Sequence, residues 1–358
     1  MTALDLIRLV FIDPEGRLRA GWRLLGHAGF LLIGIVVSIG IIVGATLAIM
    51  QGPAPPPMMV SLPVQAIPMC LVMLIVLALS AVVFETRWVG GIRIGHLRHV
   101  GLGRPFLRAM GELFLGALVA MLGMGITVGG MTLGGMEARL GDLDLAGLPV
   151  WLGMGVTLVF AALLEELLFR GYLFQWIGGS LARLGHWLLS LAGMRGGVVG
   201  ALVDLLAFGF PVLVLSVLFG VAHLTNPSAT WLAAANTVLA GIWFSVMVLR
   251  TRSLWGASIA HFVWNALMLL ILGLPVSGLS EDSGVVVGSV FELTATGPEW
   301  ISGGGYGPEG SVACIAGLVV MIAVSAVLPR RKAEDGIGAL RRVLGERGGE
   351  EEDQVMVG

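Results

Sequence analysis

Residues 156–176, VTLVFAALLEELLFRGYLFQW, form an apolar stretch interrupted by two adjacent acids, Glu165 and Glu166, and by Arg170. About 20 predominantly apolar residues suffice for an α-helix to cross the hydrocarbon layer of a bilayer. A charged side chain in such a helix costs at least about 2.5–3.5 kcal/mol on insertion scales, so its presence needs an explanation. The stretch therefore predicts a transmembrane helix whose acids have a function.

The whole chain has the composition of an integral membrane protein. Of its 358 residues, 57% are hydrophobic and 12% are charged, and the mean hydropathy is +0.95. Soluble domains contain about 25% charged residues. We therefore expect an all-α, polytopic membrane helix bundle of about eight transmembrane helices in a lipid bilayer. The expected spans are residues 25–50, 62–84, 109–131, 149–174, 211–224, 229–249, 254–274 and 311–328.

The distribution of basic residues predicts how the bundle is oriented. With eight crossings, the basic clusters in the following ranges all fall on one side of the membrane: 8–23, 87–108, 183–195, 250–252 and 330–332. Cytoplasmic loops carry an excess of Lys and Arg. We therefore expect an integral cell (inner) membrane protein with both termini in the cytoplasm. The short clusters form no extended basic face, which argues against a nucleic-acid partner.

The same pattern divides the chain into segments. We expect a cytoplasmic N-terminal segment at 1–24, three spans within 25–148, a core at 149–274, an external Gly-rich loop at 275–310, a last span at 311–328 and a disordered cytoplasmic tail at 329–358. The tail has too few large apolar residues to pack. The external loop is acidic, and its acids are Glu281, Asp282, Glu292, Glu299 and Glu309.

The spacing of the charges in residues 156–176 predicts a local ion pair. Arg170 lies four residues after Glu166, which places both side chains on one face of a helix. Glu165 points about 100° away and lacks that partner. Taken alone, the segment could also be a helix end at the membrane interface, with the arginine reaching out to water.

Two histidines favour a functional site over a helix end at the membrane interface. His223 and His261 lie in two other apolar stretches, and Asn265 follows His261 by one helical turn on the same face. Two histidines, an asparagine and two acids on three separate spans are hard to explain as isolated packing residues. We therefore expect one site built from Glu165, Glu166, Arg170, His223, His261 and Asn265.

The depth of His223 in the membrane requires a further assumption. A helix that starts near Gly196 would carry His223 to the external surface, away from Glu165. A helix that starts near Pro211, a favoured first-turn residue, would place His223 about 18 Å deep. We therefore expect a helix break around Gly209 to Pro211 and an extra interfacial or half-inserted segment near 186–208.

Three motifs occur in order along the chain: Glu165-Glu166-x-x-x-Arg170, Phe219-x-x-x-His223 and His261-x-x-x-Asn265. With the surrounding EELLFRGYLFQ, LFGVAHLTNPS and LRTRSLWGASIAHFVWN, they resemble the CAAX protease and bacteriocin-processing (CPBP) family. This is the group of intramembrane peptidases that includes the Ras-converting CAAX endopeptidase. The resemblance covers roughly residues 150–272.

The resemblance implies a role for each residue of the expected site. Glu165 would be the general base toward the water that attacks the scissile carbonyl, and His223 would position or activate that water. Glu166 and Arg170 would form the supporting ion pair. His261 and Asn265 would stabilise the oxyanion.

The sequence also allows a metal-dependent version of the site. Glu165, His223 and His261 could hold a divalent metal such as zinc, which lowers the pKa of a bound water. The chain has no HExxH motif. The residues are therefore compatible with a reaction that requires no cofactor and with one that uses a divalent metal.

The expected function is an intramembrane endopeptidase that hydrolyses a peptide bond near the membrane in a membrane-associated peptide or protein substrate. Prenylated CAAX proteins, leader peptides, bacteriocin precursors and membrane-protein segments are the substrates that the resemblance implies. Two alternatives stand beside it. One is a non-proteolytic immunity or scaffold protein of the same fold, and the other is a transporter whose Glu and His residues relay protons.

Overall fold

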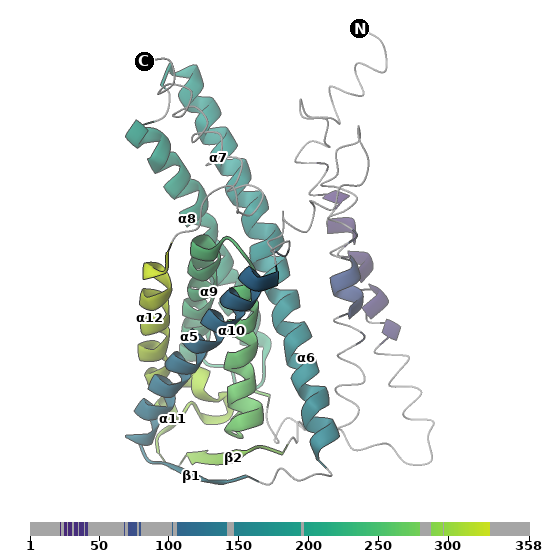
Figure 1. Ribbon diagram of the computed structural model, residues 1–358, viewed down its shortest axis with the longest axis vertical. Coiled ribbons are helices and arrows are strands. Elements are labelled where there is room, and N and C mark those ends of the chain that lie inside the picture. The colour runs from purple at the N-terminus through teal and green to yellow at the C-terminus, as the bar shows by residue number, and fades with distance from the viewer. Residues whose placement is uncertain are drawn as a thin grey trace.

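The computed structural model describes residues 106–141, 147–194, 197–279, 288–295 and 297–329, together with Leu102 and scattered positions between 22 and 79. Within these residues the chain is an all-α bundle with a small two-stranded sheet at one end (Figure 1). The spans expected at 25–50 and 62–84 lie largely outside the described residues, and so does the tail after residue 329.

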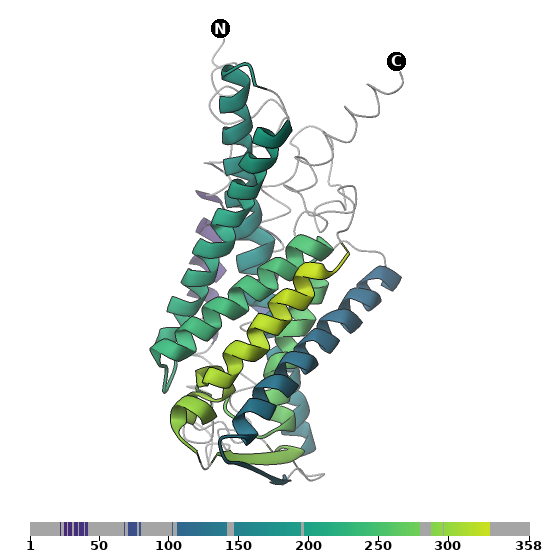
Figure 2. The ribbon, with the colours of Figure 1, turned by 90° about the vertical axis from the view of Figure 1, so that its left-hand side faces the viewer.

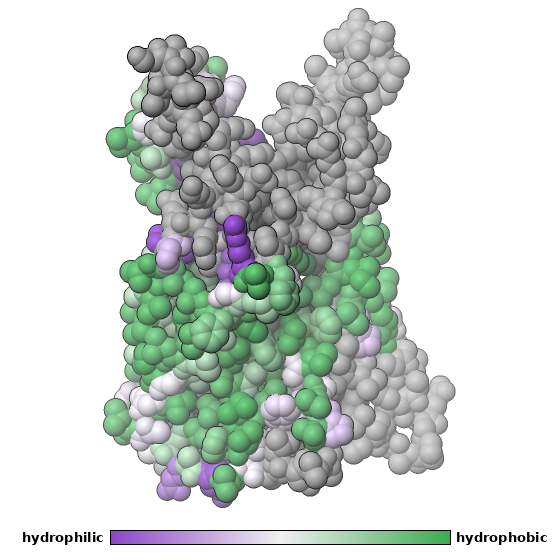
Figure 3. Space-filling view, in the orientation of Figure 1, coloured by the Kyte–Doolittle hydropathy of each residue, from purple (hydrophilic) through white to green (hydrophobic). Residues whose placement is uncertain are grey.

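The apolar stretches from residue 106 onward form helices of 12 to 27 residues. They are α5 (Phe106–Thr132), α6 (Leu148–Glu166), α8 (Gly197–Ala222), α9 (Trp231–Thr251), α10 (Trp255–Ala266) and α12 (Val312–Val327). By length and composition, α5, α8, α9 and the continuous helical run Leu148–Leu191 can each cross a membrane. Figure 3 shows hydrophobic side chains covering the flank of the bundle, as contact with lipid requires. The predicted all-α membrane bundle is confirmed.

Capping residues in the sequence define where two of these helices begin. The Thr230 hydroxyl accepts a hydrogen bond from the Ala233 amide at 3.1 Å at the start of α9. The Ser311 hydroxyl accepts one from the Cys314 amide at 3.1 Å at the start of α12. Each cap satisfies an amide that the first helical turn leaves without a partner.

A short antiparallel sheet joins two loops at the same end of the bundle. Strand β1 (Met136–Leu140) follows α5, and strand β2 (Phe291–Ala295) precedes α11 (Glu299–Ser302). Arg139 donates two hydrogen bonds to the Glu292 carboxylate, at 2.9 and 3.0 Å, and this contact lowers the pKa of Glu292. The loops that follow α5 and α10 therefore meet at the end of the bundle drawn at the bottom of Figure 1.

The main core lies between α5, α6, α9, α10 and α12. Trp243, Met247, Leu254 and Met268 are fully buried there. Cys314 is buried in the same cluster, consistent with a thiol that serves as a small hydrophobe. This core holds α6, α9 and α10 in fixed relation to one another, and these helices carry most of the expected site.

Helix α7 (Phe174–Leu191) and α8 form a hairpin that extends beyond the other helices (Figures 1 and 2). Helix α8 is continuous through Pro211, so the predicted break around Gly209 to Pro211 is wrong. Membrane helices tolerate proline when their surroundings satisfy the freed backbone groups. The first half of α8 projects beyond the bundle. The C-terminal end of α8, next to His223, therefore reaches the site although the helix has no break.

The extra length expected near 186–208 is present as the far end of this hairpin rather than as a separate half-inserted segment. His186 Nε2 lies 2.8 Å from Asp204 Oδ1 and joins α7 to α8 there. Nearer the bundle, Phe174 of α7 packs against Phe208, Val212 and Leu215 of α8. The hairpin is therefore held by its own small core.

Candidate active site

The acidic motif lies where the helix changes geometry. Glu165 and Glu166 end α6, and a π-helical stretch, Leu167–Leu173, follows before α7. A second π-helical stretch, Leu267–Ile271, follows the segment of α10 that contains His261 and Asn265. Such stretches occur frequently at functional sites, and periodicity in the sequence did not predict them.

Glu166 and Arg170 form the predicted ion pair. Arg170 Nη1 lies 3.0 Å from Glu166 Oε1, and the two side chains are 1% and 0% exposed. Arg170 Nη2 also donates to the Gly241 carbonyl on α9 at 3.1 Å. The guanidinium carbon lies 4.8 Å from the centre of the Phe219 ring on α8. These contacts tie the buried charge pair to α8 and α9 and offset part of its desolvation cost, while Arg170 Nε and Glu166 Oε2 have no hydrogen-bond partner among the described residues.

His261 is held by the same carboxylate oxygen. Its Nδ1 lies 3.1 Å from Glu166 Oε1, and its ring stacks on Phe244 at 4.7 Å with an interplanar angle of 20°. Its other nitrogen, Nε2, lies 3.9 Å from Glu165 Oε2. Glu166 thus orients the imidazole so that its free nitrogen faces Glu165.

His223 occupies a 3₁₀ turn, His223–Thr225, at the end of α8. Its Nδ1 lies 2.7 Å from the Phe219 carbonyl oxygen. A carbonyl only accepts hydrogen bonds, so Nδ1 carries the proton in this contact. In the neutral ring Nε2 then has a free lone pair, which can accept a hydrogen bond from water.

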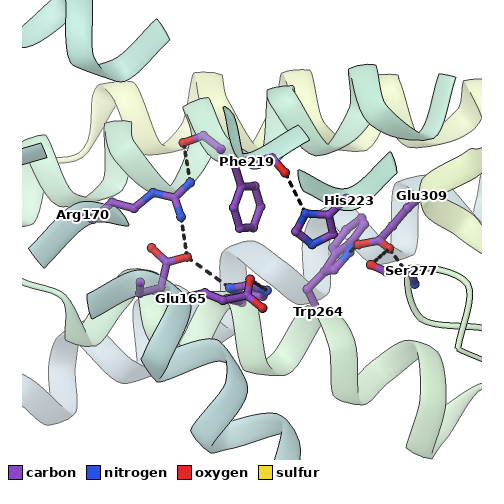
Figure 4. A network of polar contacts seen from close by, with 10 residues as sticks. Glu165, Arg170, Phe219, His223, Trp264, Ser277 and Glu309 are labelled. Atoms are coloured by element: carbon purple, nitrogen blue, oxygen red, sulfur yellow. Dashed lines mark hydrogen bonds and ion pairs between the residues drawn. The ribbon is translucent and has the colours of Figure 1, made fainter. Parts of the chain in front are cut away.

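Glu165, His223, His261 and Asn265 line one cavity of about 150 Å³. That volume is enough for several water molecules. The Glu165 Oε2 atom is buried and has no hydrogen-bond partner within the described part of the chain. Figure 4 shows Arg170 and His223 on opposite sides of the Phe219 ring, with Glu165 below the ring. The structure therefore brings four of the six expected residues to the cavity and places Glu166 and Arg170 behind them.

Sequence reasoning missed the polar residues at the other end of the cavity, Asn226, Ser277 and Glu309. Asn226 lies only three residues after His223, so its proximity to the site could have been inferred. Glu309 was counted among the acids of the external loop, but its carboxylate lies in the cavity beside Trp264 and Ser277 (Figure 4). The Gly-rich segment before it has no periodicity from which its return to the bundle could be read.

The residues named for a metal do not form a ready metal site. Among the described residues, no three His, Cys, Asp or Glu side chains are grouped as a metal ion requires. Nδ1 of each histidine is engaged, by the Phe219 carbonyl and by Glu166, and Nε2 of each ring is left for water or another ligand.

A family model matches the part of the chain that carries this geometry. Residues 147–267 match the model of the family described as type II CAAX prenyl endopeptidase Rce1-like. The matched segment contains all six expected site residues and the helices that present them. No curated protein and no solved structure matches the chain at a significant level. Over residues 147–267, the match confirms the resemblance to CAAX proteases that the three motifs predicted.

Proposed function

We propose that this membrane protein is an intramembrane endopeptidase that hydrolyses a peptide bond near the membrane by a water activated at Glu165. The family match supports a CAAX-protease-like peptidase. The observation that carries the proposal is the convergence of the Glu165 carboxylate and two imidazoles, from three separate segments, on one cavity within an apolar bundle. Peptide hydrolysis needs a base, a water and donors for an oxyanion, and this arrangement can supply all three.

In the first step the water attacks the scissile carbonyl carbon. Glu165 takes a proton from the water, while His223 Nε2 accepts a hydrogen bond from it and fixes its direction. The new C–O bond forms as the carbonyl π electrons move to oxygen, which gives a tetrahedral oxyanion. A positioned general base of this kind contributes about 10²- to 10⁴-fold to the rate.

His261 and Asn265 then act on the oxyanion. In its protonated form His261 has a donor on each nitrogen, so Nδ1–H serves Glu166 and Nε2–H faces the cavity. The Asn265 amide, one turn further along α10, can supply a second donor. Collapse of the intermediate breaks the C–N bond, and Glu165 returns its proton to the leaving amine. The products are a carboxylic acid and an amine, which become a carboxylate and an ammonium group at neutral pH when one proton passes from the acid to the amine.

Membrane-associated peptides or proteins are the proposed substrates, and a cell (inner) membrane with both termini cytoplasmic is the proposed location. The apolar walls of the cavity, which include Leu158, Phe219 and Phe244, suit a segment that leaves the lipid phase. Within the family class, prenylated CAAX sequences and bacteriocin or leader peptides are candidate substrates.

The proposal is tested by replacing the base. We expect purified Glu165→Gln to lose at least about 10²-fold of peptidase activity on a synthetic peptide library in detergent micelles, read by mass spectrometry. Glu137→Gln, at an exposed acid of β1, is the matched control and should retain activity. If wild-type protein cleaves nothing under conditions in which it stays folded, a scaffold or immunity role replaces the peptidase. Full activity of Glu165→Gln would remove this mechanism.

Removal of divalent metal provides a second test. Because the described histidines and acids form no metal-binding group, we expect activity to survive dialysis against a strong zinc chelator. The measurement is the cleavage rate before and after dialysis, together with the zinc content of the purified protein. Loss of activity that returns with added zinc would instead assign Glu165, His223 and His261 as metal ligands.

A further inference from the structure

The cavity contains a second carboxylate that the proposed mechanism does not use. Glu309 lies in the turn Pro308–Gly310, directly before α12, and reaches the cavity from the loop end of the bundle. Its Oε1 accepts a hydrogen bond from Trp264 Nε1 at 3.1 Å. Its Oε2 accepts from the Ser277 amide at 2.9 Å and from the Ser277 hydroxyl at 2.5 Å.

The backbone of this turn is fixed as well as its side chain. Asn236 of α9 donates through Nδ2 to the carbonyls of Glu309 and Ser311, both at 2.8 Å. Trp264 lies on α10 one turn after His261, so the same helix holds both ends of the cavity. Glu309 is therefore a positioned group and not a mobile loop acid.

The charge on Glu309 has no cationic partner in the described part of the chain. Its three donors are an indole N–H, a backbone N–H and a hydroxyl, all of them neutral. The cavity lining includes Glu165, Glu309 and His261 but neither Lys nor Arg, and Arg170 is paired with Glu166 outside the lining. The protonated His261 of the proposed mechanism balances the charge of Glu165, so the charge of Glu309 stays unbalanced. In a space of low dielectric constant, such unbalanced negative charge attracts a cation strongly.

A neighbouring phenol does not balance the charge of Glu309. Tyr306 is 1% exposed, and its hydroxyl makes polar contacts with the side chains of Ser277, Thr237 and Asn226, which line the cavity. Burial and the Glu309 charge raise the pKa of Tyr306 to about 12, although these three contacts lower it, so the phenol stays protonated and neutral near pH 7.

We propose that Glu309 is a specificity-determining residue that binds a basic side chain of the substrate next to the scissile bond. This inference rests on the proposed peptidase function, because the same cavity holds Glu165. The substrate class is then a membrane-associated peptide with Lys or Arg beside the cleaved bond. The basic group binds at Glu309 while the scissile carbonyl lies at Glu165.

The experiment compares wild-type protein with Glu309→Gln on a synthetic peptide library in detergent micelles, with cleavage sites read by mass spectrometry. We expect wild-type cleavage to be enriched for Lys or Arg at one position beside the cleaved bond. Glutamine is nearly isosteric and keeps an acceptor oxygen, but it has no charge. Glu309→Gln should therefore lose the enrichment. Glu292→Gln, at the exposed acid of β2, is the matched control and should keep it.

A matched pair of peptides, one with Lys and one with Gln at that position, gives the quantitative result. We expect Glu309→Gln to lower kcat/KM about 10- to 100-fold on the Lys peptide, and less than about threefold on the Gln peptide. Equal losses on both would make Glu309 a structural residue that only holds Trp264 and Ser277, and would overturn the inference. Wild-type cleavage without a basic preference would also overturn it, while the peptidase proposal would stand. Absence of any wild-type cleavage would remove both.

Discussion

One carboxylate oxygen, Glu166 Oε1, accepts hydrogen bonds from both Arg170 and His261. The neighbouring Glu165 has a buried oxygen without such a partner and faces the cavity. Two adjacent acids of identical chemistry thus have different surroundings because successive helical residues point about 100° apart. One acid is bound in a network that orients an imidazole, and the other is free to take a proton from water.

This network predicts an asymmetric response to mutation. Arg170→Met leaves Glu166 as a buried charge without its strongest partner, so we expect a loss of about 3–5 kcal/mol in stability. The double variant Glu166→Gln/Arg170→Met removes both charges and should recover most of that loss. Its activity should stay at least about tenfold below wild type, because a neutral amide stabilises protonated His261 less well.

Thermal unfolding in detergent micelles, followed by intrinsic fluorescence, measures the first effect, and peptide cleavage measures the second. If the double variant were as unstable as Arg170→Met alone, the instability would come from lost guanidinium packing against Phe219 rather than from an unpaired charge.

The contact between α8 and α9 sets the position of His223, and it depends on a close approach at Gly241. A Cβ atom added at Gly241 would lie 2.9 Å from the Cα of Ser216 on α8, closer than side chains pack. The carbonyl of Gly241 is also the acceptor for Arg170. The small residue therefore lets α8 approach α9 and exposes a backbone acceptor at the site.

We expect Gly241→Ala to force α8 away from α9, with a cost of about 1–3 kcal/mol in stability and a clear loss of activity. The matched control is Gly209→Ala in α8, where an added Cβ meets no atom within 4 Å. Alanine there should leave activity unchanged and can raise stability by up to about 1 kcal/mol, because glycine is the poorer helix former. Thermal unfolding and cleavage assays on both variants check this pair, and similar behaviour of the two would contradict it.

Helices and local pairs were predictable from the sequence, because both depend on near neighbours in the chain. The apolar stretches predicted the helices from α5 onward, and i, i+4 spacing predicted the Glu166–Arg170 pair. The ordered motifs predicted the residues that converge on the cavity.

Features that depend on contacts between distant segments of the chain could not be predicted from the sequence. The contact between His261 and Glu166 joins residues 95 positions apart. The return of Glu309 to the cavity depends on a Gly-rich loop whose path no periodic pattern specifies. The continuity of α8 through Pro211 was mispredicted, because the depth argument assumed that every helix ends at the limits of the bundle.

Among the described residues, several arginines lie at one end of the molecule, and Arg139, which is paired with Glu292, lies at the other. Arg183 lies on the projecting hairpin, and Arg250 ends α9, where its guanidinium binds the Leu328 carbonyl at the end of α12. The opposite end carries the β1–β2 sheet and the turn that contains Glu309. The positive-inside rule assigns the arginine end to the cytoplasm. On that assignment, Glu309 reaches the cavity from the external side and Glu165 from the other direction.

Single cysteines can test this orientation in intact cells. In a background with Cys70→Ala and Cys314→Ala, we expect Thr294→Cys, on exposed β2, to react with a membrane-impermeant maleimide added outside. Arg183→Cys, exposed on α7, should react only after the cells are permeabilised, because arginine-rich ends stay in the cytoplasm. Labelling is read as a mass shift of the purified protein. The reverse pattern would show that the bundle has the opposite orientation, with the projecting hairpin outside the cell. The internal geometry of the cavity would be the same in that orientation. Labelling of both positions before permeabilisation would contradict a bundle that spans the bilayer between them.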